Sequence, residues 1–133
     1  MSVNIKIYPD YFPANCPPND ALEEEIIVYR LCESNPVSEN DFLSHFILNP
    51  NRNYNGKLQA FGLSVISDIE EIEKMRNISP IMRKKKYVAT GMTMGSSGVI
   101  KKTPSNNCNS HITWWLIKEA LPHAYFEVCK EVV

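Results

Sequence analysis

The segment Ser110-His-Ile-Thr-Trp-Trp115 combines an imidazole, two hydroxyls and two indoles in a short stretch. In a β-strand, successive side chains point to opposite faces, which places His111, Thr113 and Trp115 together on one face. Such a set can hydrogen-bond a polar ligand and stack on a flat one. The alternative is structural, with Trp115 covering a second small core and His111 binding a loop carbonyl. The other face is apolar and is expected to be buried: Ile112, Trp114 and Leu116.

Arg30 is the one charged residue in the apolar run from Ile26 to Leu31, where it follows Tyr29. A guanidinium in such a strand needs a partner or a cleft, because an isolated buried charge is very costly. The functional interpretation is a clamp for a phosphate or carboxylate, since the planar fork suits bidentate oxyanions. The structural interpretation is an ion pair with a carboxylate nearby in the sequence: Glu33, Asp41 or one of Glu23, Glu24 and Glu25.

Other polar residues carry weaker signals. A basic run, Arg83 to Lys86, could bind phosphates together with Lys101 and Lys102, or could protect a strand edge against aggregation. The adjacent Ser44 and His45 fall on a predicted helix, and their spacing alone indicates little. The glycines do not have the spacing of a dinucleotide-binding or Walker loop, and the H-E-x-x-H and G-x-S-x-G motifs are absent from the sequence.

The elements that position these residues are predicted from the spacing of apolar residues and from the residues that begin or end helices and strands. Seven strands are expected, at Val3–Tyr8, Ile26–Leu31, Ala60–Ile66, Lys86–Thr93, Gly98–Lys102, His111–Ile117 and Ala124–Val128. Capping boxes at Ser38–Asp41 and Ser67–Glu70 predict helices over about 39–48 and 68–77. Helices early and strands late indicate an α+β fold, a mainly antiparallel curved sheet or two small sheets, rather than regular βαβ winding.

Length and composition indicate one globular domain spanning residues 1–133. Hydrophobic residues make up 44% and charged residues 22% of the chain, an ordinary globular mixture. A formal net charge of −1 gives no global attraction to nucleic acid or anionic membranes, so neither is an expected partner. The N-terminus lacks the pattern of a secretory signal, and no apolar stretch is long enough to span a bilayer. We therefore expect a cytoplasmic protein.

The cysteines at positions 16, 32, 108 and 129 include no Cys-x-x-Cys pair. Because cytosolic thiols normally stay reduced, we expect four free thiols and no disulfide. The alternative is a zinc site built on Cys108 and His111 with Cys16 or Cys32 added by the fold.

Motifs spread over nearly the full chain resemble a family of small bacterial proteins that has no established activity. The motifs are Cys16-Pro-Pro, Val28-Tyr-Arg30, Asp41-Phe-Leu-Ser-His45, Gly62-Leu-Ser-Val65, Thr103-Pro-Ser105 and Ser110-His-x-Thr-Trp-Trp115. This resemblance implies a bacterial origin and no particular chemistry.

Val28-Tyr29-Arg30 and Gly62-x-Ser64-Val65 also resemble, in order, two pieces of the ADP-ribosyltransferase-like fold. That resemblance implies a transferase in which Tyr29, Arg30 and Ser64 hold NAD. It also implies a late glutamate at the nicotinamide ribose, for which Glu127 is the best-placed residue. Separately, His111-x-Thr113 is similar to one copy of the His-x-Thr signature of two-histidine phosphoesterases; a second copy is absent from the sequence.

Together these features predict a protein that binds or acts on a nucleotide-like ligand, with NAD as one possibility. In this hypothesis Arg30 holds phosphate, Trp115 or Tyr29 stacks on the ligand, and His111 is the acid–base group. The alternative is a protein-binding or regulatory module that docks a partner on the His111/Trp115 face, because exposed aromatic residues and arginines form binding hot spots. The two hypotheses differ in whether Arg30 and His111 converge.

Overall fold

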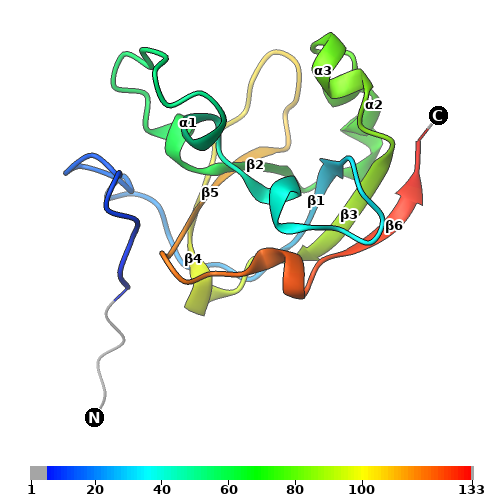
Figure 1. Cartoon of the computed structure of the whole chain (residues 1–133). Coiled ribbons are helices and arrows are strands. Elements are labelled where there is room, and N and C mark those ends of the chain that lie inside the picture. The colour runs from blue at the N-terminus through cyan, green and yellow to red at the C-terminus, as the bar shows by residue number, and fades with distance from the viewer. Residues whose placement is uncertain (1–5, 133) are drawn as a thin grey trace.

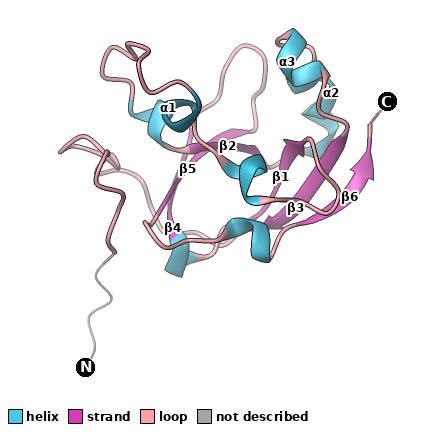
Figure 2. Ribbon diagram, in the orientation of Figure 1, coloured by secondary structure: helices cyan, strands magenta, loops and turns pink. Residues whose placement is uncertain are grey.

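A single antiparallel sheet of six strands forms the framework of the molecule in the computed structural model, which describes residues 6–132 (Figures 1 and 2). Its strand order is β4-β5-β2-β1-β3-β6. The strands are β1 (Ile27–Cys32), β2 (Leu63–Ile66), β3 (Tyr87–Met92), β4 (Gly98–Lys102), β5 (His111–Leu116) and β6 (Glu127–Glu131). The predicted α+β class is therefore confirmed. No helix among residues 6–132 has the length and apolarity needed to cross a bilayer.

The helices are shorter than the capping boxes predict. They are α1 (His45–Leu48), α2 (Ile72–Arg76) and α3 (Pro80–Arg83), with 3₁₀ turns at Glu39–Phe42, Leu58–Phe61, Ile69–Glu71, Gly95–Ser97 and Pro122–Ala124. The predicted helix over 39–48 is divided because Leu43 is extended, and Ser44 then caps α1 by accepting from the Ile47 N–H. The second helix begins as a 3₁₀ turn capped by Asp68.

Two apolar cores lie on the two faces of the sheet. The larger core includes Val28, Phe42, Leu63, Trp114 and Phe126. The smaller core joins Leu31, Ile66 and Val88 to residues Ile72 and Met75 of α2. Strand β1 contributes to both cores, which agrees with a sequence that is apolar on both faces apart from Arg30.

Two predicted strands differ from the structure in part, and one helix was not predicted. Of the predicted strand at Val3–Tyr8, residues 3–5 lie outside the described part, and residues 6–8 form no strand. At the free edge of β4, Leu22 pairs with Ile100 in an isolated antiparallel bridge instead. The last strand starts at Glu127 rather than Ala124, because Pro122 begins a 3₁₀ turn. Helix α3 was not predicted, although Ser79 caps it and Pro80 occupies its first turn.

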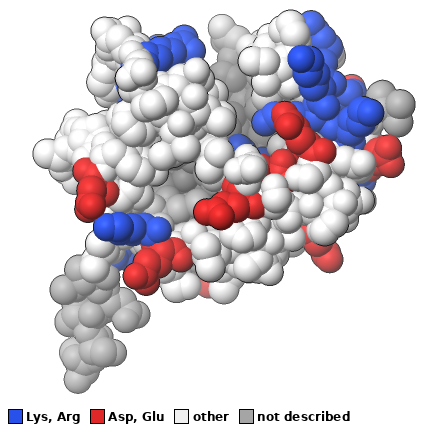
Figure 3. Space-filling view, viewed as in Figure 1, with Lys and Arg blue, Asp and Glu red and all other residues white. Residues whose placement is uncertain are grey.

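The helices and one loop surround the same end of the sheet. In Figure 1, α1 and the α2–α3 pair stand apart above the sheet, and the loop between β4 and β5 rises between them. The surface is hollowed between these two parts in Figure 3, with basic side chains on either side. The polar residues described next line this end of the molecule.

Candidate functional site

Arg30 joins β1 to the rest of the site through main-chain carbonyls. Strands β1 and β2 share a single register pair, Tyr29 with Ile66, whereas β1 and β3 pair along their whole length. Beside that pair, Arg30 Nη1 donates to the Ser64 carbonyl at 2.7 Å. Its Nε donates to the Asp41 carbonyl at 2.7 Å and its Nη2 to the Leu43 carbonyl at 3.4 Å. The guanidinium thus fastens the segment before α1 to the sheet.

The Asp41 carboxylate does not neutralise this guanidinium. Its oxygens accept from the Glu33 and Ser38 N–H groups at 2.9 and 3.0 Å and from the Ser34 hydroxyl at 2.5 Å. Burial raises the pKa of Asp41, but these hydrogen bonds to its charged form outweigh burial and lower it. Within residues 6–132 Arg30 makes no ion pair, so the predicted pair with Glu33, Asp41 or the Glu23–Glu25 run is wrong. The Asp41 carboxylate oxygens therefore take their hydrogen bonds from Glu33, Ser34 and Ser38 rather than from Arg30.

Three cationic side chains lie close enough to His45 to act on its charge: Arg30, Arg52 and Lys85. The pKa of His45 is lowered by partial burial and then by the positive charges of Arg30, Arg52 and Lys85. The pKa of Lys85 is likewise lowered, first by burial and next by Arg30. We call these four residues the cationic cluster. They come from β1, α1, the loop after α1 and the segment between α3 and β3.

His111 lies beside the cationic cluster at the start of β5. Its Nδ1 contacts both the hydroxyl and the carbonyl of Thr103, at 2.8 and 3.1 Å. Because a carbonyl only accepts, the contact with the Thr103 carbonyl is a hydrogen bond in the tautomer that carries its proton on Nδ1 and its lone pair on Nε2. The pKa of His111 is lowered by burial, in part restored by its Thr103 hydrogen bond, and lowered again by His45. His45 is therefore near both Arg30 and His111.

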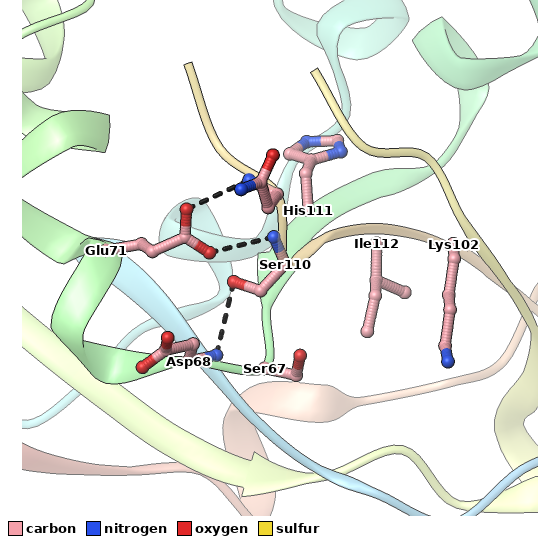
Figure 4. Close-up of a pocket in the computed structure, with 8 residues that line it drawn as sticks. Ser67, Asp68, Glu71, Lys102, Ser110, His111 and Ile112 are labelled. Carbon is pink, nitrogen blue, oxygen red and sulfur yellow. Dashed lines mark hydrogen bonds between the residues drawn. The ribbon is translucent and has the colours of Figure 1, made fainter. Parts of the chain in front are cut away.

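A clasp formed by Glu71 holds the loop that precedes His111 (Figure 4). Its carboxylate accepts from the N–H groups of Asn109 and Ser110 at 2.9 and 2.8 Å. The Ser110 hydroxyl in turn accepts from the Asp68 N–H at 3.2 Å. Hydrogen bonds from Ser110 and Asn109 lower the pKa of Glu71. The turn before α2 thus sets the position at which β5 begins.

A cavity of about 300 Å³ opens beside the clasp. Its lining is mostly polar and comprises Ser67, Asp68, Glu71, Lys102, Asn109, Ser110, His111 and Ile112. In Figure 4, Ile112 and Lys102 point away from the side of the strand on which His111 lies. The Glu71 carboxylate and the Ser110 hydroxyl are engaged in the clasp, so their hydrogen-bonding capacity is already used in part within the protein.

Two of the predicted ligand-binding residues are unavailable to a ligand. His111, Thr113 and Trp115 do share a face, as alternation predicts, but Thr113 and Trp115 are each only 1% exposed. The Thr113 hydroxyl contacts that of Thr103 at 2.9 Å, and the Trp115 indole donates to the Leu58 carbonyl at 3.0 Å. The stacking role and the docking face predicted for Trp115 are therefore wrong, because the loop before β2 covers that face.

The remaining predicted site residues lie in different parts of the sheet. Ser64 and Tyr29 are partly buried. Ser64 lies on β2, where its carbonyl accepts from Arg30, whereas Tyr29 precedes Arg30 on β1 and packs against the smaller core on the other face of the sheet. Glu127 is exposed on the edge strand β6, opposite Thr90. Strands β2, β1 and β3 separate it from His111 on β5, on the order of 19 Å at the usual strand spacing. The two residues predicted to be catalytic, His111 and Glu127, are therefore not brought together by the fold.

The sequence singles out His45 and Lys85 without joining them, and it does not single out Arg52. His45 follows the cap residue Ser44, and Lys85 belongs to the basic run, but Lys101 of that predicted patch instead pairs with Asp20 at 2.8 Å. Arg52 belongs to no motif recognised in the sequence. The four cysteines are free, as predicted, and no group of three or more metal-ligating side chains occurs in the described range 6–132. Cys108 faces the Ser110 hydroxyl at 3.7 Å.

A comparison with protein families, curated proteins and solved structures finds no match to this chain. The resemblances drawn from the sequence motifs therefore remain expectations. Any function assigned to the protein depends on its own site: a cationic cluster whose members form no ion pair within residues 6–132, set beside the His111 imidazole.

Proposed function

We propose that the protein binds a phosphate-bearing small molecule of the nucleotide class at the cationic cluster. The observation that supports this most strongly is the absence, within residues 6–132, of any ion pair involving Arg30, His45, Arg52 or Lys85. Four basic side chains from four segments converge there in a chain whose formal net charge is −1. A local excess of this kind is what an anionic ligand requires.

Electrostatic repulsion within the cluster favours this interpretation. Burial is the main cause of the lowered pKa values of His45 and Lys85, and the positive charge of Arg30 lowers both further, whereas Cys32, Glu33 and Asp41 act to raise that of Lys85. An anion placed among them reverses the sign of that interaction and stabilises every cationic form. Phosphate is the natural partner, since arginine and lysine both bind it by charge-assisted hydrogen bonds.

The cluster residues would have different roles in binding the ligand. Arg30 has five N–H donors and gives three of them to carbonyls, so it supplies mainly charge. Lys85 and the exposed Arg52 keep their donors for ligand oxygens. His111, beside His45, would accept a proton at Nε2 from a ligand hydroxyl. NAD carries two phosphates and is the ligand that the ADP-ribosyltransferase-like resemblance implies.

The test compares two adjacent lysines by isothermal titration with pyrophosphate and with NAD at low salt. Lys85→Gln removes a cluster charge and should weaken binding by about tenfold or more, because a hydrogen bond to a charged group contributes roughly 1.5–3 kcal/mol. Lys84→Gln removes the same charge from the exposed position next to it and should leave the affinity within about twofold. Equal losses in the two variants, or no binding of pyrophosphate at about 1 mM, would contradict the proposal.

A further inference from the structure

The segment from Lys74 to Lys86, which runs from α2 through α3 to the residue before β3, has a strong local excess of positive charge. It contains six of the 14 lysines and arginines of the chain and no aspartate or glutamate. Four of the six are exposed and make no ion pair within residues 6–132: Lys74, Arg83, Lys84 and Lys86. Basic side chains accordingly gather over the α2–α3 pair in Figure 3. The formal net charge of −1 therefore hides a basic surface at this end of the molecule.

Protection of a strand edge does not explain the basic run from Arg83 to Lys86. The run leads into β3, which is an interior strand that pairs with β1 on one side and with β6 on the other. Charges that prevent edge-to-edge aggregation are expected on an edge strand instead. An anionic partner does explain the run, because such a partner is attracted by a local excess of cations.

Two isoleucines in the middle of this basic segment face solvent. Ile81 of α3 is 67% exposed, the highest value among the large apolar residues of the described part of the chain, and Ile78 is 47% exposed. They lie on either side of Ser79, the residue that caps α3. Met82, which follows Ile81, packs instead against the smaller core. The turn between α2 and α3 therefore presents two aliphatic side chains outward, with cationic residues before and after them in the chain.

Hydrogen bonds within the α2–α3 pair hold this turn in place. Arg76 Nη2 donates to the Arg83 carbonyl at 3.2 Å, and its Nε donates to the Lys85 carbonyl at 3.4 Å. The Ser79 hydroxyl accepts from the Met82 N–H at 3.2 Å. In Figure 1 the two helices stand above the sheet at one end of the molecule. A flat surface can therefore meet the turn without rearrangement of the sheet.

We propose that the turn between α2 and α3 docks on an anionic phospholipid bilayer. Ile78 and Ile81 enter the interfacial region of the bilayer, while Arg83, Lys84 and Lys86 bind the phosphates of the headgroups. Exposed apolar residues next to basic ones are typical of segments that lie in this interface, and each lysine or arginine near an anionic membrane adds attraction. A single-stranded nucleic acid would also attract the cations, but it stacks on aromatic side chains, and none occurs between Lys74 and Lys86.

The experiment measures the binding of the full chain to vesicles by co-sedimentation at physiological salt. Vesicles of phosphatidylcholine alone are compared with vesicles of equal parts phosphatidylcholine and phosphatidylglycerol, and the anionic vesicles should bind about tenfold more tightly or better. The double variant Ile78→Ser/Ile81→Ser should weaken binding to the anionic vesicles by about tenfold or more, because it removes the apolar side chains that enter the interface. Lys84→Gln/Lys86→Gln should weaken it to a similar degree.

Two matched controls change the same residue types elsewhere on the surface. Leu121→Ser removes an exposed aliphatic side chain at a position before the last 3₁₀ turn. Lys57→Gln/Lys118→Gln removes two exposed positive charges outside the basic segment. Both variants should bind the anionic vesicles within about twofold of the unmodified protein, since charges farther from the membrane than a Debye length are largely screened.

A spin-labelled lipid in the anionic vesicles provides a readout that does not depend on any variant folding. In the unmodified protein it should broaden the methyl NMR signals of Ile78 and Ile81 more than those of Leu121. Equal binding to the two kinds of vesicle, no binding to either, or equal losses in the isoleucine variant and in Leu121→Ser would overturn the proposal. So would tighter binding to a DNA oligonucleotide that depends on the lysines and not on the isoleucines. Pyrophosphate binding should be unchanged in the isoleucine variant, because the cationic cluster does not include these residues.

Discussion

At the scale of single residues, Arg30 shows how a charge can be placed within a sheet without a counter-charge. Its planar fork reaches carbonyls of Asp41, Leu43 and Ser64, and its guanidinium carbon lies 5.9 Å from the centre of the Phe42 ring. Burial lowers its pKa, while nearby Cys32 and Asp41 act to raise it. The side chain thus has a structural role in joining three segments, and its charge contributes to the cationic cluster.

Replacing this guanidinium should destabilise the fold. Arg30→Met removes three hydrogen bonds and leaves partly buried carbonyls without donors, so we expect the free energy of unfolding to fall by about 2–4 kcal/mol in urea melts. Arg52→Met removes an exposed arginine of the same cluster and should change stability by no more than about 0.5 kcal/mol. If Arg30→Met were as stable as Arg52→Met, the anchoring role would be refuted.

At the scale of elements, the loop between β4 and β5 is held in place mainly by hydrogen bonds to another part of the chain. Its own main-chain pairing consists of one isolated bridge, Ser105 with Cys108. The Glu71 clasp and the Ser67 N–H, which donates to the Ser110 carbonyl at 3.2 Å, attach its end to the turn before α2. His111 follows directly, so the clasp indirectly positions its imidazole.

Breaking the clasp should loosen this loop without unfolding the sheet. In Glu71→Ala the N–H groups of Asn109 and Ser110 lose their acceptor, and their amide exchange should become about tenfold faster or more, as expected for local opening. Glu70→Ala changes the neighbouring exposed carboxylate and serves as the control. Unchanged exchange at both amides in Glu71→Ala would mean that the loop is held by other contacts.

At the scale of the whole molecule, the grouped basic residues link stability to pH. The pKa values of His45 and His111 are lowered from 6.5 in the folded protein, so the unfolded chain binds more protons as pH falls through that value. Stability should therefore rise between about pH 5.5 and 7.5. Below about pH 4, the lowered pKa values of Asp41 and Glu71 act in the same direction, since protonation removes their hydrogen-bonded charged forms.

Urea melts at these two pH values provide the measurement. The double variant His45→Gln/His111→Gln should lose most of the difference in unfolding free energy between about pH 5.5 and 7.5. Pyrophosphate affinity should change in the opposite direction and increase as pH falls, because an anion favours the protonated imidazoles. A double variant with the pH dependence of the unmodified protein would show that other groups are responsible.

The α+β class, most of the strands and the face on which each side chain of β5 lies could all be predicted from the order of residues along the chain. Alternation depends only on local geometry, so it correctly joined His111 to Thr113 and Trp115, and the Ser38–Asp41 capping box is present in the structure. It also correctly marked Arg30 as a residue that needs partners. These features come from neighbours along the chain, whose spacing is fixed by the backbone.

Only the tertiary structure decided what covers each face and which distant residues meet. Trp115 is buried because the loop before β2 folds over it, and Glu127 is remote from His111 because the strand order places them on different sides of β1. Neither the burial of Trp115 nor the position of Glu127 can be predicted from the residues next to it in the sequence. The cationic cluster likewise assembles from four segments, and Arg30 finds carbonyls rather than carboxylates, because both depend on where the chain returns after long separations in sequence.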